Sequence, residues 1–284
     1  MVLCQDNKYR IKINPSFKLF TTFALFKTSM AVYSTEITSD LIPSDNPIHQ
    51  RLLKPYMETV SMVNGRLLEI GCGEGRGVDY LLPRATHYTA VDKNKALIKR
   101  LAGQYPSSTF LQASVPPLPF DDKTFDTVVS FQVIEHIKND HDFLQEIKRV
   151  LTPGGKAILT TPNGPMSLSR NPWHVREYTE AELTKLCSGL FEHVTVNGIA
   201  GNRRVMEYYE RNKASVNKLM RFDVLDLQHR LPAAWLRIPY EWMNRINRNK
   251  LKHQSDELVR GITHKDYYLS DSPETSLDLF CVLH

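Results

Sequence analysis

The sequence of 284 residues lacks most features that mark specialised classes of protein. Its four cysteines are far apart and form no CxxC pair, which argues against a zinc site and against a disulfide framework. The apolar run at residues 19–26 is far shorter than the roughly 20 residues that a membrane-spanning helix requires. Internal repeats and low-complexity stretches are absent. We therefore expect a cytoplasmic protein with reduced thiols and an ordinary hydrophobic core.

Acidic residues are missing from one stretch near the amino terminus, residues 8–35. We expect residues 1–45 to form an extension outside the fold, with residues 1–29 lying upstream of a second start at Met30. The net charge of +5 permits attraction to anionic substrates or lipid surfaces. Because Lys and Arg are not concentrated on one element, we expect no nucleic acid partner.

Apolar segments typical of strands and helices alternate along residues 46–161. The pattern predicts strands at 66–70, 87–91, 109–112, 125–130 and 156–161, and helices at 46–62, 94–105 and 140–151. Several strands are almost continuously apolar, which is typical of a parallel sheet covered on both faces. The alternation therefore predicts an α/β fold with a doubly wound, mostly parallel, seven-stranded sheet of Rossmann-like type.

The pattern changes after residue 161. A helix at 180–188 and a strand at 192–197 are followed by a polar, basic and helical region, and residues 276–283 alternate like an antiparallel strand. We therefore predict a core at 46–200, a helical basic insertion or lid at 201–262, and a closing strand of the core within 263–284.

A glycine-rich loop follows the first predicted strand, with glycines at every second position from Gly71 to Gly77. Ligands of open α/β sheets bind at the carboxyl ends of the strands, and glycine lets the backbone approach them closely. Asp92 ends the next strand about 20 positions later, where a carboxylate can hold both hydroxyls of an adenosine ribose. The loop and Asp92 therefore predict a nucleotide cofactor.

The charge of the loop distinguishes between two such cofactors. Glu69 and Glu74 would oppose the pyrophosphate of NAD at the helix amino terminus. S-adenosylmethionine (SAM) instead brings a sulfonium and an ammonium group, which favour nearby carboxylates. We therefore predict SAM, with Glu69 on the ligand side; the alternative for Glu69 is a carboxylate that caps local backbone amides.

Several segments resemble the class I SAM-dependent methyltransferases, and among them the small-molecule, ubiquinone-biosynthesis-like group. They are residues 67–75 (LLEIGCGEG), 90–92 (AVD), 118–120 (LPF), 125–126 (FD), 131–136 (FQVIEH) and 149–155 (RVLTPGG). Each segment alone is a modest signal, but their order and spacing match those of the family. The resemblance covers roughly residues 50–197 and the final strand.

The resemblance implies a role for each matching residue. The methionine part of SAM would lie along the backbone of Gly71, Cys72, Gly73 and Gly75. Asp92 would bind the ribose, and Lys93 or Asn94 would lie against the adenine. Ser114 stands where the family usually has an acid that accepts from the adenine amino group, so this contact is weaker here. Gln132 would border the methyl donor.

Two histidines are candidates for a general base. His136 follows a strand at the active end of the sheet, and His174 lies in a later loop. For His136, a packed, hydrogen-bonded structural histidine is an equal alternative. Related enzymes can hold a divalent cation with an acid three residues before the Glu-His pair. Here Gln132 replaces that acid and leaves only Glu135 and His136, so we predict no metal.

The loop at residues 171–178 lies where members of the family close over their acceptor. Trp173, Arg176 and Tyr178 offer an aromatic wall and an anion-binding fork, and are predicted to bind the acceptor together with His174. The alternative is structural: Arg176 would pair with Glu177, and Trp173 would fill the core.

The basic region contains a segment, residues 235–252, that is rich in aromatic and cationic residues. It is a candidate for peripheral membrane contact. A lid over the acceptor, a dimer contact and a solvated helical cap are the alternatives.

These observations predict a SAM-dependent methyltransferase that acts on a small-molecule, lipid-linked or glycan-linked acceptor, at oxygen. The alternatives are an inactive SAM-binding protein of the same fold and, less favoured, a nicotinamide-dependent oxidoreductase. The fold alone does not decide between them.

Overall fold

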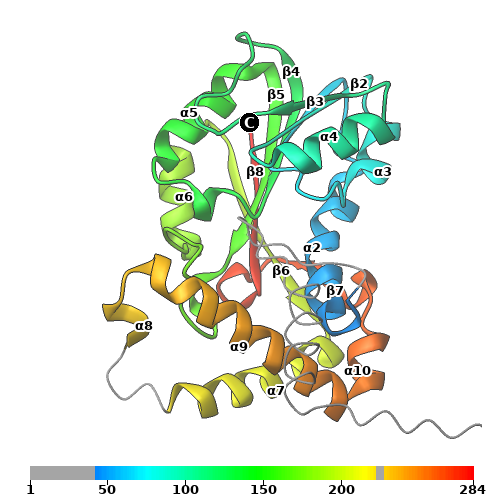
Figure 1. Ribbon diagram of the computed structural model, residues 1–284. Coiled ribbons are helices and arrows are strands. Elements are labelled where there is room, and N and C mark those ends of the chain that lie inside the picture. Colours follow the sequence, from blue (N-terminus) through cyan, green and yellow to red (C-terminus); the bar gives the residue numbers. More distant parts are fainter. Residues whose placement is uncertain (1–41, 222–226) are drawn as a thin grey trace, which may run out of the picture. The chain divides into compact units, whose positions relative to one another are not determined.

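The computed structural model describes residues 42–221 and 227–284. Within them an eight-stranded sheet has the order β3-β2-β1-β4-β5-β8-β6-β7 (Figure 1). The strands are β1 (Arg66–Ile70), β2 (His87–Asp92), β3 (Thr109–Gln112), β4 (Phe125–Phe131), β5 (Leu151–Pro162), β6 (Val194–Gly201), β7 (Tyr267–Ser270) and β8 (Asp278–Leu283). The first five pair in parallel, whereas β8 runs antiparallel to both β5 and β6. The predicted doubly wound sheet with an antiparallel closing strand is confirmed.

Sequence analysis missed one strand of the described sheet. β7 pairs antiparallel with β6 at the sheet edge, so the described sheet has eight strands where seven were expected. The helices of the described residues are α2 (Asn46–Thr59), α3 (Val78–Leu81), α4 (Lys95–Gln104), α5 (Asp140–Val150), α6 (Glu180–Ser188), α7 (Arg203–Met220), α8 (Leu227–Arg230), α9 (Ala233–Gln254) and α10 (Asp256–Gly261). Among them, no helix combines the length and the apolarity needed to cross a membrane.

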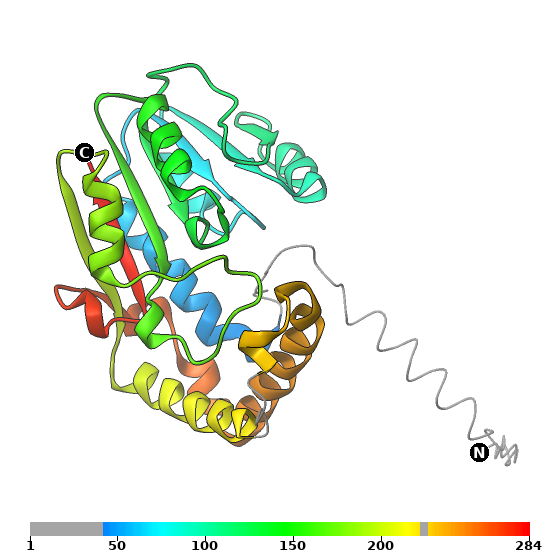
Figure 2. The same cartoon turned by 90° about the vertical axis from the view of Figure 1, so that its left-hand side faces the viewer.

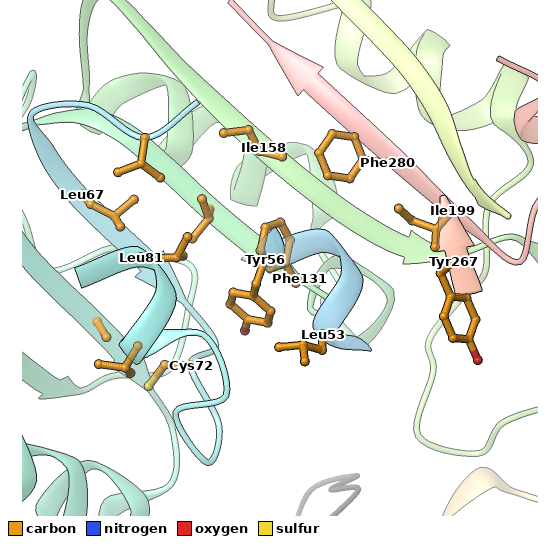
Figure 3. Packing of buried hydrophobic residues seen from close by; sticks show 14 of the residues in the cluster. Leu53, Tyr56, Leu67, Cys72, Leu81, Phe131, Ile158, Ile199, Tyr267 and Phe280 are labelled. Atoms are coloured by element: carbon orange, nitrogen blue, oxygen red, sulfur yellow. The ribbon is translucent and has the colours of Figure 1, made fainter. Parts of the chain in front are cut away.

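Both faces of the sheet are covered, because successive side chains of a strand point to opposite faces. Leu67 of β1 packs with α2, α3 and α4, whereas the next residue, Leu68, packs with α5 and α6. Both side chains are fully buried. Figure 3 shows part of the first cluster, in which the rings of Tyr56 and Phe131 meet edge to face with centroids 4.7 Å apart. Burial on both faces explains why the central strands are almost continuously apolar.

The end of the predicted amino-terminal extension belongs to the fold, so that boundary was placed too late. A 3-10 helix, η1 (Pro43–Asp45), precedes α2. Asp45 is fully buried and accepts hydrogen bonds from Arg245, at 2.8 Å, and from Arg248 on α9. The rest of the predicted extension, residues 1–41, lies outside the described residues.

The region predicted to be a helical insertion contains α7, α8, α9 and α10, which lie between β6 and β7 in the chain. Val205 of α7, Leu251 of α9 and Val259 of α10 are buried in the same cluster as Leu67. These helices therefore share the core with the sheet. Figure 1 shows α7 and α9 beyond the carboxyl ends of the parallel strands.

Candidate cofactor and acceptor site

The glycine loop begins where β1 ends. The backbone N–H of Gly71 donates to the carbonyl of Val91 at the end of β2, at 2.8 Å. Gly71 has a φ of +79°, and a Cβ there would lie 2.4 Å from Cγ2 of Val133. Any other residue would therefore combine a strained backbone with a clash. The glycine keeps the loop tight against the ends of three strands.

Asp92 is fixed beside this loop. Its Oδ2 accepts from the backbone N–H of Gly73 at 3.0 Å, and its Oδ1 accepts from the backbone N–H of Asn94 at 2.8 Å. Gly73 has a φ of +52°, and a Cβ there would meet open space. The open side of the loop therefore adjoins an oriented, partly exposed carboxylate. This arrangement fits a ligand with vicinal hydroxyls, because each carboxylate oxygen can accept further hydrogen bonds.

Glu69 is buried between two tyrosines. Its carboxylate accepts from the hydroxyl of Tyr56 at 2.7 Å and from the hydroxyl of Tyr88. Burial raises the pKa of Glu69, and the two phenolic hydrogen bonds only partly oppose this. Both of these hydrogen bonds come from tyrosine side chains. The alternative expectation, that Glu69 caps backbone amides, does not describe them. Its contact with the cofactor stays a prediction.

The predicted cofactor residues differ in whether their side chains are exposed to a ligand. The side chain of Cys72 is only 2% exposed and lies in the first core cluster, so Cys72 can serve the loop only through its backbone (Figure 3). Burial also raises the pKa of this thiol. Lys93 and Ser114 are exposed beyond the ends of β2 and β3. The side chain of Asn94 caps α4 by accepting from the backbone of Leu97, among others.

Gln132, the first residue after β4, has an unusual backbone conformation. Its φ of +57° lies in the left-handed region, which non-glycine residues rarely occupy and which often marks functional sites. The side-chain amide donates to Oδ1 of Asp278 at 3.3 Å. The buried Asp278 in turn forms an ion pair with the partly buried Arg51 of α2, at 2.5 Å between Nε and Oδ2. Burial lowers the pKa of Arg51, but Asp278 outweighs this, so the guanidinium stays charged.

Sequence analysis did not foresee the Arg51–Asp278 pair. The two residues lie 227 positions apart, and neither belongs to a recognisable motif. The one indication is that Arg51 lies on the face of α2 that is otherwise buried, where a cation requires an anionic partner. Asp278 of this pair accepts a hydrogen bond from Gln132. The pair therefore helps to position a residue that is predicted to border the methyl donor.

The two predicted catalytic histidines lie next to each other. His136 is in a 3-10 helix, η3 (Ile134–His136), directly after β4, and His174 is in the loop that follows β5. Their rings meet edge to face with centroids 5.0 Å apart. Nδ1 of His136 lies 2.9 Å from the carbonyl oxygen of Trp173. A carbonyl only accepts, so Nδ1 carries the hydrogen and the basic nitrogen of neutral His136 is Nε2.

His174 is held by two neighbours in its own loop. Its Nδ1 lies 2.7 Å from Oε1 of Glu177, and its Nε2 lies 2.8 Å from Nδ2 of Asn171. The backbone N–H of Trp173 donates to Oδ1 of Asn171, which turns the amide nitrogen toward the ring. Since the carboxylate accepts and the amide nitrogen donates, the neutral imidazole carries its hydrogen on Nδ1. Nε2 is therefore the basic nitrogen here as well.

Arg176 and Tyr178 are tied to a different carboxylate. Both donate to Oδ2 of Asp140 at the start of α5, Tyr178 at 2.9 Å, and Arg176 also donates to the carbonyl of Lys138 at 2.8 Å. The alternative in which Arg176 pairs with Glu177 was therefore wrong, because Glu177 holds His174. Tyr178 is only 4% exposed. Their predicted contact with an acceptor stays a prediction, and these hydrogen bonds fix the loop against α5.

Trp173 joins the loop to α9. Its indole N–H donates to Oε1 of Glu241 at 3.0 Å, and the guanidinium carbon of Arg237 lies 4.3 Å from the ring centroid. Trp173 is half-buried and does not fill the core as the alternative proposed. Figure 2 shows the loop after β5 beside α9, which is coloured orange. The predicted acceptor loop and the helical region thus form one surface.

Three potential metal ligands come together beside this loop. One ligand atom each from Glu135, His136 and His174 lies within 4.8 Å of the others. The expectation of no metal rested on the replacement by Gln132 and did not consider His174. In this arrangement His174 already contacts Asn171 and Glu177, so a cation would have to displace one of them. The absence of a metal stays a prediction.

Comparison with known proteins bears on these features. A family described as a methyltransferase domain matches residues 68–159, which include the glycine loop, Asp92 and the histidine after β4. Residues 68–159 of this chain match a methyltransferase domain, as the resemblance to class I SAM-dependent methyltransferases predicted. The predicted family is confirmed.

The relatives of this methyltransferase domain match part of the chain. A probable SAM-dependent methyltransferase of Mycolicibacterium smegmatis is 39% identical over 137 residues, which cover 46% of this chain and 53% of the relative. A phthiotriol/phenolphthiotriol dimycocerosates methyltransferase of Mycobacterium leprae is 33% identical over 167 residues, 56% of this chain and 60% of the relative. The chain thus spans between half and two thirds of the length of these relatives.

A solved structure resembles the whole methyltransferase fold. It is a SAM-dependent methyltransferase, possible histamine N-methyltransferase, from Thermotoga maritima, with a TM-score of 0.53 and 13% identity. The likeness covers 94% of this chain and 98% of that one. At this identity the likeness supports the fold and leaves the acceptor open.

Proposed function

We propose that this chain transfers a methyl group from SAM to a hydroxyl oxygen of a lipid or small-molecule acceptor. The observation that carries the proposal is the Asp92 carboxylate, held by the amides of Gly73 and Asn94 at the open side of the glycine loop. Vicinal ribose hydroxyls match this carboxylate, and the left-handed glycines let a ligand approach the loop. The loop lacks the GxGxxG register of the dinucleotide-binding proteins and contains Glu74, which disfavours a pyrophosphate.

The residues beside this site supply base chemistry. When bound, SAM supplies an activated methyl group, so the protein has to align the acceptor and remove its proton. The basic nitrogen of His136 and of His174 is Nε2, and their rings are adjacent. Nε2 of His174 accepts from Asn171 at 2.8 Å, so an acceptor has to displace that amide to reach it. The acceptor O–H would donate to one Nε2, which would take the proton. The acceptor oxygen would gain the methyl group as the methyl–sulfur bond breaks, and S-adenosylhomocysteine would leave. A positioned base of this kind contributes about 10²–10⁴-fold.

Glu177 supports this base. Its carboxylate accepts from Nδ1 of His174 and stabilises the positive charge that the ring gains when Nε2 takes a proton. The backbone carbonyl of Trp173 accepts from Nδ1 of His136, while the indole of Trp173 is held by Glu241. These contacts fix the acceptor loop before an acceptor arrives.

A lipid acceptor is the substrate class that we favour. The Mycobacterium leprae relative is named for methylation of phthiotriol dimycocerosates, which are lipids. Helix α9, which contacts the acceptor loop, belongs to the basic region and carries exposed aromatic side chains. Such a surface suits an amphipathic acceptor better than a small polar metabolite.

The proposal is tested with SAM labelled in its methyl group. The purified chain is incubated with the total lipid extract of the organism that encodes it and, separately, with the aqueous extract. Label is expected in the organic phase, in a product whose methyl group is bound to oxygen, and is expected to fall about 100-fold in His174→Gln. Transfer only into the aqueous fraction would contradict the lipid acceptor. SAM binding without transfer into either fraction would favour the inactive binding protein.

A further inference from the structure

Helix α9 exposes an apolar stripe. Its members and their exposed fractions are Trp235 (72%), Ile238 (63%), Trp242 (54%), Met243 (36%) and Ile246 (47%). They follow one another at intervals of three or four residues, apart from one adjacent pair, and so occupy one face of the helix. Isolated exposed apolar residues are normal, but five on one helical face indicate a contact surface. We call these residues the α9 stripe.

The other faces of α9 are bound to the protein. Leu251 and Asn247 are buried, and the side-chain amide of Asn247 donates to Asn212 of α7 at 2.6 Å. Arg245 donates to the buried carboxylate of Asp45 at 2.8 Å and 3.1 Å. The helix therefore cannot rotate to hide the stripe without leaving the buried carboxylate of Asp45 unpaired, which is costly.

Positive charge lies beside the stripe. A depression between α7 and α9 is lined by Arg211 and Lys218 from α7 and by Lys250 from α9. Arg211 is paired with Glu207, so the two lysines carry most of the net positive charge. Lys250 comes one helical turn after Ile246, the last member of the stripe. The same surface thus combines an apolar strip with a cluster of cations.

We propose that the α9 stripe and these three cations dock the protein on the surface of an anionic lipid bilayer. Amphipathic helices that lie in the interface plane join an apolar face containing Trp with Lys and Arg at its border. Tryptophan favours the interface because its ring is apolar and its N–H is polar. A second copy of the chain is a poorer occupant, since its matching face carries the same cations and offers them no anionic partner.

The helix that bears the stripe also holds the candidate acceptor loop, on its opposite side. Arg237 and Glu241 project from α9 and hold Trp173 of the acceptor loop, at 4.3 Å and 3.0 Å respectively. A bilayer in contact with the stripe would therefore lie about one helix diameter, roughly 10 Å, from the loop that we assign to a lipid acceptor. The docking proposal itself rests on exposure and charge, and stands independently of methyl transfer.

The test uses the full chain and vesicles of two compositions, phosphatidylcholine alone and phosphatidylcholine with about one third phosphatidylglycerol. We expect co-sedimentation with the anionic vesicles and a blue shift of tryptophan emission. The chain has three tryptophans, two of them in the stripe, so the shift reports directly on this face. Trp235→Gln with Trp242→Gln is expected to weaken vesicle binding at least about tenfold.

Matched variants separate this face from the rest of the surface. Tyr80→Gln with Tyr268→Gln removes two aromatics that are exposed elsewhere, at 40% and 48%, and is expected to bind like the wild type. Lys218→Gln with Lys250→Gln should remove the preference for anionic vesicles, whereas Lys99→Gln with Lys185→Gln should not.

Two outcomes would overturn the proposal. One is wild-type protein that binds anionic vesicles no better than neutral ones. The other is a self-associated wild type that the double tryptophan variant converts to monomer while vesicle binding stays unchanged. Both outcomes can be read without any assay of methyl transfer, so they are distinguishable from failure of the proposed function.

Discussion

The hydroxyl of Tyr56 on α2 donates to the buried carboxylate of Glu69 at the end of β1, at 2.7 Å. The hydroxyl of Tyr88 on β2 donates to the other oxygen of the same carboxylate. Glu69 therefore links a helix and two strands, two residues before the glycine loop begins. The loop would shift if this carboxylate moved, which ties the stability of the core to the shape of the cofactor site.

The first prediction concerns Glu69→Gln and pH. Burial raises the pKa of Glu69 above its usual value of 4.5, so the folded state binds this proton more tightly than the unfolded state. The wild-type free energy of unfolding should then decrease as pH rises from about 4.5 through the folded pKa, by at most about 1.4 kcal/mol per pH unit. Urea unfolding of the Gln variant should lack this component. Glu192→Gln, at an exposed position, serves as the control and should keep the wild-type slope.

The spacing of apolar residues predicted most of the helices and strands of the core. The helix at 180–188 matched α6 because its start is encoded nearby: Thr179 accepts from the backbone of Glu182, whose side chain bonds back to Thr179. β7 was missed, since a four-residue strand has little periodicity of its own and depends on its pairing with distant β6. Apolar runs reveal burial, whereas an edge strand is defined by its neighbour.

The sequence predicted only part of the candidate site, because some of its contacts depend on residues far apart in the chain. The loop glycines and Asp92 carry a signal in their spacing, and the structure places them together. The partner of Arg176 is Asp140, which lies 36 positions away, and not the adjacent Glu177. Sequence adjacency suggested the wrong pair, because an adjacent carboxylate need not face its neighbour once the chain folds. The left-handed Gln132 has no sequence signature at all.

The second prediction concerns Asp92→Ala and cofactor affinity. Loss of the carboxylate should remove the two charge-assisted hydrogen bonds that we propose it makes to the ribose, and it releases the backbone N–H of Gly73. Calorimetric titration with S-adenosylhomocysteine should show at least about a hundredfold weaker binding, because each such bond contributes about 1.5–3 kcal/mol. NADH should not bind to the wild type.

A substitution away from the site provides the control for Asp92. Asp121 is exposed in the segment before β4, at the amino end of that strand. Asp121→Asn should keep wild-type affinity for S-adenosylhomocysteine. Equal binding by wild type and Asp92→Ala would show that the ribose is held elsewhere and would remove the main support for the proposed function.

The third prediction concerns Glu177, a positioning residue for His174. Glu177→Gln should lower kcat about tenfold to a hundredfold while leaving the KM for SAM unchanged, because the hydrogen bond of the carboxylate goes to the imidazole. The double variant with His174→Gln should be no slower than His174→Gln alone, since residues that act as a unit are not additive. Additive losses, or a raised KM for SAM, would instead indicate that Glu177 maintains the loop as a whole.

The fourth prediction concerns divalent metals at Glu135, His136 and His174. A site with two imidazoles and one carboxylate would favour Zn²⁺ over Mg²⁺, which prefers oxygen ligands. Nε2 of His174 already accepts from Asn171, so metal binding would cost that hydrogen bond. We therefore expect that EDTA leaves methyl transfer unchanged and that equimolar Zn²⁺ does not raise Tm. A rise in Tm with Zn²⁺ that disappears in His136→Gln would reverse this prediction and make the cluster a metal site. In that case Asn171→Ala, which removes the competing donor, should bind Zn²⁺ more tightly than the wild type.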